Sequence, residues 1–158
     1  MPTADPGTLQ DLFSRVGIRQ LFQPGQQLQP PFQAPMGVWF VCSGVVRSLM
    51  PLPPTGEWRT LERHSAGTLV GWVGVINDRA LEHLRAAEHV EALFLPRNRF
   101  NDLWQQQPPL SAWCAAQRPR VEALQVLQTL AHGDPARAKQ LDDWQHLLPE
   151  VQWLIDTE

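Results

Sequence analysis

The stretch that decides the fold is Val38-Trp39-Phe40-Val41-Cys42-Ser43-Gly44-Val45-Val46-Arg47. Aromatic and β-branched residues, which favour strands, lie on both sides of Ser43-Gly44, a pair typical of a tight turn. Glycine suits such a turn, because hairpin positions often require a positive φ angle. The stretch therefore predicts two antiparallel strands joined as a β-hairpin.

Further strand-sized apolar runs lie outside this hairpin, at residues 58–61, 69–70 and 90–95. The turn residues that separate the runs include Pro24-Gly25, Pro53 to Gly56, Ala66-Gly67 and Asn77-Asp78. Many short strands at regular turn spacing are typical of an antiparallel sandwich or barrel. In the last run, Val90, Ala92 and Phe94 alternate with other residues, which predicts a strand with one apolar face.

Helical patterns flank this β region. One starts near Thr8, a candidate N-cap, and ends at Gly17. After Pro96, helices are predicted around residues 100–104, 110–116, 121–130 and 138–148. We expect an N-terminal helix in residues 1–19, a β domain with its following helix in 20–113, and a helical connector or extension in 114–158. The predicted fold class is mainly β with flanking helices.

The composition excludes several classes of protein. With 158 residues and 43% hydrophobic composition, the chain can bury a sizeable core, and its two cysteines exclude a disulfide scaffold. No apolar run approaches the roughly 18 residues that a membrane-spanning helix needs, so we expect no direct membrane insertion. Met1 to Gln10 lacks a basic region followed by an apolar core, so we expect no signal peptide and a cytoplasmic protein.

The charge is distributed unevenly along the chain. The net charge is −3, and residues 101–158 carry eight acidic groups against four basic ones. Proteins that bind DNA depend on basic side chains that neutralise phosphates. The C-terminal third therefore has the wrong sign for a DNA-reading helix, and we expect no DNA partner.

Residues that often carry catalysis or bind metals form no known pattern. His64, His83 and His89 could surround a metal in a cupin-type barrel enzyme, but the His-x-His pair with a nearby carboxylate is missing. We expect them on the surface or in turns. Cys42 and Cys114 lie in apolar segments without a neighbouring histidine, so we expect packed thiols. We predict no metal site and no enzyme.

The middle of the chain resembles the cyclic-nucleotide-binding domain family, the sensory β-roll (jelly roll) of catabolite-activator-type regulators. Five elements match in order: the glycine turn in Phe22 to Leu28, the hairpin in Val38 to Arg47, the run from Gly56 to Leu61, Gly67 to Gly71, and Leu95 to Leu103. The resemblance covers about residues 20–113. It implies a double-stranded β-roll in which the segment after Gly67 would contact a cyclic phosphate.

The ligand-binding residues of that family are altered here. Nucleotide-binding members place Glu after the second glycine, for the ribose, and Arg a short loop later, for the phosphate. In this chain Gly71 is followed by Trp72, the expected Arg position falls near Ala80, Arg79 is one position away, and Arg85 belongs to the next strand. We expect a degenerate site, without a cofactor, in which a cyclic nucleotide is disfavoured and Trp72 fills its space or stacks on another planar ligand. Its candidate residues are Gly71, Trp72, Val73, Arg79, Ala80 and Arg85.

A narrower resemblance concerns Gly67 to Ile76 and Ser43 to Leu49. These segments resemble the version of the domain that precedes peptide-exporting bacterial ABC transporters with a cysteine-peptidase domain. The resemblance implies a non-enzymatic regulatory or protein-docking module of a secretion machine, whose partners are other domains of the same polypeptide or a transporter. Such a module would reach the membrane only through the larger polypeptide.

An alternative function is a catabolite-activator-type transcription regulator that lacks its DNA-binding part and binds a cyclic nucleotide or another small effector. The apolar stripe Val121, Leu124, Leu127 and Leu130 lies where family members place their dimer helix. It predicts a docking helix, which either packs back onto the barrel or forms a homodimer.

Overall fold

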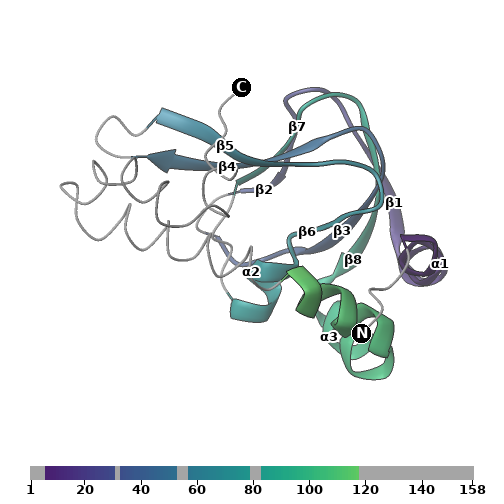
Figure 1. Cartoon of the computed structure of the whole chain (residues 1–158). Helices are drawn as coiled ribbons and strands as arrows, with labels where there is room; N and C mark the ends of the chain where they lie inside the picture. Colours follow the sequence, from purple (N-terminus) through teal and green to yellow (C-terminus); the bar gives the residue numbers. More distant parts are fainter. Residues whose placement is uncertain (1–5, 31–32, 53–56, 79–82, 118–158) are drawn as a thin grey trace.

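The computed structural model describes residues 6–30, 33–52, 57–78 and 83–117 (Figure 1). In chain order its elements are α1 (Pro6–Val16), β1 (Ile18–Phe22), β2 (Gln27–Gln29), β3 (Gly37–Ser43), β4 (Val46–Leu52), β5 (Glu57–His64), β6 (Leu69–Val70), α2 (Trp72–Asn77), β7 (His83–Ala86), β8 (Val90–Pro96) and α3 (Arg97–Gln106). Residues 108–117 are also helical. The predicted docking stripe from Val121 to Leu130 and the predicted helices after Pro119 lie outside the described residues.

The strands form two antiparallel four-stranded sheets, in the orders β1-β8-β3-β6 and β2-β7-β4-β5. Figure 1 shows the two sheets facing each other, with α1 and α3 on the far side of the first sheet. The predicted class is therefore confirmed: the chain is a β-roll with flanking N- and C-terminal helices. No helix in the described ranges is long and apolar enough to cross a membrane.

The two strands and the glycine turn predicted from Val38 to Arg47 are present as β3, Gly44 and β4, but the predicted hairpin is not: β3 and β4 do not pair, because they belong to different sheets, and β4 pairs with β5 and β7 instead. Gly44, between β3 and β4, has a φ of +84°, which residues with a Cβ rarely adopt. A Cβ at this position would also collide with the backbone carbonyl of His89. β3 lies between β8 and β6 in its sheet, while β4 lies between β7 and β5 in the other. The turn at Gly44 therefore carries the chain from one sheet of the roll to the other.

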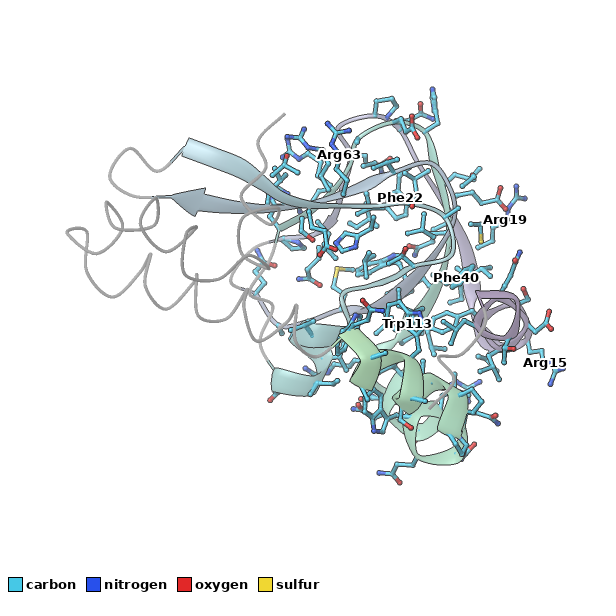
Figure 2. The ribbon with its side chains drawn as sticks, in the orientation of Figure 1. Arg15, Arg19, Phe22, Phe40, Arg63 and Trp113 are labelled. Atoms are coloured by element: carbon cyan, nitrogen blue, oxygen red, sulfur yellow. The ribbon has the colours of Figure 1, made fainter. Side chains whose placement is uncertain are left out.

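Two apolar clusters lie on opposite faces of the first sheet, because successive side chains of a strand point to opposite faces. The roll-interior cluster, between the sheets, is built on Phe22, Leu28, Trp39, Val41, Val46, Val70, Leu84, Ala86, Val90 and Ala92. The helix-side cluster is built on Leu9, Phe13, Val38, Phe40, Leu69, Trp72, Val75, Leu95, Phe100, Leu110, Trp113 and Cys114. Figure 2 shows Phe22 between the sheets, and Phe40 and Trp113 toward the helices.

Several boundaries differ from the sequence-based expectations. α1 begins at Pro6, so Thr8 lies within the helix rather than capping it. β1 begins at Ile18, two residues before the predicted start of the β domain at residue 20. The short helix α2 was not predicted as a helix, because its sequence Trp72-Val73-Gly74-Val75-Ile76-Asn77 is rich in β-branched residues and contains glycine.

Candidate functional site

Gly71 holds α2 directly against the first sheet. Its φ is +86°, and a Cβ there would lie 2.7 Å from the carbonyl oxygen of Gly37 and 3.1 Å from the ring of Trp39. The helix that starts here ends at Asp78, whose left-handed backbone conformation lets its N–H bond the carbonyls of Gly74 and Val75. The carboxylate of Asp78 also forms an ion pair with the guanidinium of Arg97 in α3, with 3.2 Å between Oδ1 and Nη1. Both ends of α2 are therefore fixed by local backbone geometry.

Trp72, at the position where nucleotide-binding relatives carry Glu, points into the helix-side cluster. Its side chain is 8% exposed, and its ring meets that of Trp113 edge to face, with centroids 6.1 Å apart. Val73 packs against the same cluster. The sequence predicts that Trp72 fills the space of a nucleotide or stacks on another planar ligand; in the structure its side chain lies in the helix-side cluster. The side chain instead anchors α2 to the helical layer.

The arginines of the second sheet lie on its outer face. Leu84 and Ala86 of β7 face the roll interior, so Arg85 between them faces outward, where it is directly opposite Arg47 of β4. Arg47 is in turn opposite Arg63 of β5 and donates a 2.8 Å hydrogen bond from Nε to Thr60 Oγ1. Figure 2 shows Arg63 on this outer side.

The prediction that Arg85 belongs to the strand after the loop is confirmed, since β7 spans His83–Ala86. Arg79 and Ala80, the other candidates for the phosphate position, lie outside the described residues. The structure therefore places Gly71, Trp72 and Val73 at the start of α2, on the helix side of the first sheet, and Arg85 on the outer face of the second sheet.

The inner face of β4 and β5 carries three polar side chains, which we call the inner polar cluster: Ser48, Glu62 and His64. Val46 of the roll-interior cluster is directly opposite His64, and Ser48 is directly opposite both Glu62 and Leu84, so all three polar groups face the interior. Ser48 is fully buried, and the side chains of Glu62 and His64 are 9% and 13% exposed. Ser48 Oγ and His64 Nε2 are hydrogen-bonded at 2.8 Å, and Glu62 Oε2 lies 3.8 Å from the same nitrogen.

The histidines are mostly not where the sequence predicted them. His64 and His83 lie in strands and are largely buried, whereas His89 is exposed as expected. Burial lowers the pKa of His64 to about 4, and burial together with nearby Arg85 lowers the pKa of His83. Both rings are therefore neutral near pH 7, because burial disfavours the charged imidazolium.

Serine, histidine and carboxylate meet in the inner polar cluster, but they do not form a catalytic triad. In a triad the carboxylate and the nucleophile contact different nitrogens of the ring. Here both oxygens lie nearest Nε2. Within the described ranges, no group of three or more His, Cys, Asp or Glu side chains could hold a metal ion, as the cupin alternative would need. The geometry supports hydrogen bonding rather than nucleophilic or metal chemistry.

The cysteines are packed thiols, as predicted. Cys114 is buried in the helix-side cluster, and Cys42 of β3 packs partly buried against it. Burial raises the pKa of both thiols. Since the reactive form is the thiolate, neither is activated for nucleophilic chemistry.

Sequence reasoning missed the inner polar cluster. The signal was Glu62-x-His64, a spacing that places two side chains on one face of a strand. Ser48 adds a polar residue two positions after the inward-facing Val46. The sequence could not show that the two strands pair with these residues opposite each other.

Comparison with known structures gives the same β-roll. The catabolite activator protein of Thermus thermophilus is 25% identical, with a TM-score of 0.64, over 77% of this chain and 58% of its own. The c-di-GMP-responsive global regulator CLP of Xanthomonas campestris is 19% identical, with a TM-score of 0.57, over 91% and 66% respectively. The cAMP-binding acyltransferase of Mycobacterium smegmatis is 17% identical, with a TM-score of 0.58, over 73% and 36%. The similarities to the regulator CLP and to the acyltransferase, both below 25% identity, show only that this chain shares their fold.

This chain thus spans less than two thirds of the length of each of these three proteins. No curated protein sequence matches it significantly. The family model of the cyclic nucleotide-binding domain matches residues 19–107. Because this match covers more than half of the 158 residues, the chain belongs to the cyclic nucleotide-binding domain family.

Proposed function

We propose that this chain is a non-enzymatic regulatory module that uses the cyclic nucleotide-binding fold without responding to cyclic nucleotides. The observation that carries the proposal is Trp72. Trp72 occupies the position at which nucleotide-binding relatives carry the Glu that contacts the ribose. Its side chain is buried in the helix-side cluster, where its ring contacts that of Trp113. A carboxylate cannot replace it there without being buried among apolar groups, which is costly.

The charges of the second sheet support the same proposal. A cyclic phosphate needs a cation, best supplied as a two-pronged guanidinium. Arg47, Arg63 and Arg85 lie on the outer face, and the ionisable side chains described on the inner face of β4, β5 and β7 are Glu62 and His64. Of these, Glu62 would repel a phosphate and the neutral imidazole of His64 would not attract it strongly.

Two kinds of parent protein fit such a module. Similarity to the Thermus catabolite activator protein favours the catabolite-activator-type regulator. The acidic excess of residues 101–158 favours an output through protein contacts rather than DNA. The association with a peptide exporter rests on the Gly71-Trp72 motif and its neighbours alone. A peptidase or membrane segment encoded in frame after Glu158 would support it, and a stop codon there would remove it.

The test is calorimetric titration of the full chain with 3′,5′-cyclic AMP and cyclic GMP. We expect no binding heat up to millimolar nucleotide. A nucleotide-binding member of the family serves as the positive control under the same buffer conditions. A micromolar Kd for either nucleotide would overturn the proposal.

A further inference from the structure

Exposed apolar side chains concentrate around β1. Among the described residues, the large apolar side chains that are exposed are Val16, Ile18, Leu21, Met36 and Ile76. Three of these five lie within residues 16–21, and two belong to β1, where Ile18 is 57% and Leu21 is 63% exposed. Their side chains point to opposite faces of the sheet, because they are three positions apart on one strand. β1 therefore presents apolar surface on both of its faces.

β1 is also the edge strand with the least protection against pairing with another chain. Proteins protect edge strands by making them very short or by placing charges on them. Of the other edge strands in the two described sheets, β6 has two residues, β2 has three, and β5 carries charged residues that include Glu62 and Arg63. β1 has five residues and a single charged one, Arg19. No described strand pairs with its outer edge.

The polar side chains of β1 are engaged within their own sheet. Arg19 Nε donates a 2.7 Å hydrogen bond to Glu91 Oε1 of β8, and Figure 2 shows Arg19 at the periphery of the roll. Gln20 Oε1 accepts a 2.9 Å hydrogen bond from Trp39 Nε1. The charge of Arg19, which would deter another strand from pairing, is thus neutralised by Glu91.

The sequence of β1 is complementary to itself. Two antiparallel copies of Ile18–Phe22 match all five residues only when Gln20 lies opposite Gln20 of the second copy. In this register Ile18 lies opposite Phe22 of the second copy, so two apolar side chains meet on one face. On the other face, Arg19 lies opposite Leu21 of the second copy, which can pack on the apolar stem of the arginine.

The charges fit this register as well. Antiparallel pairing about Gln20 keeps the two Arg19 side chains from lying opposite each other, whereas parallel pairing in register would oppose them directly. Glu91 is the neighbour of Leu21 across β8. Arg19 therefore falls in the same row as Glu91 of the second copy, with Leu21 of that copy between them.

We infer that this chain forms a symmetric dimer in which β1 pairs antiparallel with β1 of a second copy, so that their first sheets become one eight-stranded sheet. The contact is isologous, because each strand offers the same residues to the other. The inference is independent of the proposed function. Five paired residues on each side bury less than the roughly 1,200 Å² of a standard interface, so the dimer is weak and forms at micromolar or higher concentration.

Sedimentation equilibrium of the full chain, from about 1 μM to about 1 mM, measures the dimer Kd. Leu21→Lys places a second cation opposite Arg19 of the other copy and leaves the rest of β1 unchanged. Ile76→Lys, which changes a 48% exposed apolar residue on α2 in the same way, is the matched control. Circular dichroism checks that both variants are folded.

Disulfide cross-linking tests the register. Residues directly opposite each other in antiparallel strands have Cα atoms about 4.5–5.5 Å apart, which a disulfide can bridge. An oxidised mixture of Arg19→Cys and Leu21→Cys chains should therefore give a disulfide between residues 19 and 21, found by mass spectrometry. Leu21→Cys alone should not link residue 21 to itself, because those two positions are out of register. The parent chain, with Cys42 and Cys114, is the control for other disulfides.

We expect the parent and Ile76→Lys to dimerise alike, and Leu21→Lys to raise the Kd by about tenfold or more, because like charges directly opposite each other destabilise a strand pair. A parent chain that stays monomeric over the whole concentration range would overturn the inference. If folded Leu21→Lys dimerises as well as the parent, the dimer uses another surface, and the assignment to β1 is wrong. A disulfide between residues 21 of two copies, without one between 19 and 21, would contradict the register about Gln20.

Discussion

At the scale of single residues, Gly71 combines a left-handed backbone conformation with a close contact between its own segment and that of Gly37. Gly25 has nearly the same φ, +83° against +86°, but a Cβ there would meet nothing within 4 Å, whereas at Gly71 it would lie 2.7 Å from the Gly37 carbonyl. Gly25→Ala should therefore cost about 1 kcal/mol for the backbone conformation alone, and Gly71→Ala about 3 kcal/mol with the added collision. Urea unfolding of both variants measures the difference. Equal losses would mean that the contact with Gly37 relaxes freely.

His64 should make stability depend on pH. Burial lowers its pKa to about 4 from the ordinary 6.5, so between these values the unfolded chain binds a proton that the folded chain does not. Stability then rises with pH through this interval: the contribution is complete above pH 6.5 and is lost as the pH falls toward 4, by about 3 kcal/mol for such a shift. The lowered pKa of His83 acts in the same direction.

The variant His64→Gln keeps hydrogen-bonding capacity toward Ser48 and removes the titration. Its unfolding free energy, measured in urea from pH 4 to 7, should vary less with pH than that of the parent. His89→Gln, at an exposed side chain, is the control and should retain the parent's slope. An unchanged slope in His64→Gln would show that the ring is not buried as described.

At the scale of elements, α2 depends on its tryptophan. Trp72→Glu restores the residue type of nucleotide-binding relatives but places a carboxylate in the helix-side cluster, at a position 8% exposed. We expect a loss of about 3 kcal/mol or more and no gain of cyclic AMP binding, because the position where binding relatives carry Arg falls near Ala80 in this chain. Ile76→Glu, on the same helix at a position 48% exposed, should change stability by less than about 1 kcal/mol. A stable Trp72→Glu variant that binds cyclic AMP would contradict this account of α2.

The elements differ in how far local sequence determines them. The strands β3 and β4, the glycine turn between them and the apolar face of β8 follow from local signals, and all were predicted. The predicted pairing of β3 with β4 was wrong, because which strands become neighbours in a sheet depends on the whole fold. Helix α2 was not predicted, because a tight approach to Gly37 and the burial of Trp72 outweigh its weak helix propensity. The inner polar cluster was missed for a related reason: which residue of β4 lies opposite which residue of β5 depends on a register shift after Ser48 that no single-strand pattern reveals.

At the scale of the whole molecule, β3 joins the roll and the helices into one cooperative unit. Its side chains alternate between the two clusters: Val38 and Phe40 belong to the helix-side cluster, and Trp39 and Val41 to the roll-interior cluster. All four are at most 2% exposed, so neither cluster can open without exposing one face of the same strand. The physical expectation is a single unfolding transition for sheets and helices.

Native-state hydrogen exchange tests this coupling. Val38→Ala and Val41→Ala each remove methyl groups from a different cluster, at a cost of about 2 kcal/mol. If β3 couples the clusters, each variant lowers the exchange free energy of the slowest amides in β7 and in α3 by the same amount, because both exchange through global unfolding. Leu21→Ala, at a 63% exposed position of β1, is the control and should leave these amides nearly unchanged. Loss of protection confined to α3 in Val38→Ala, or to β7 in Val41→Ala, would show that the helical layer and the roll open independently, and β3 would then not couple the two clusters.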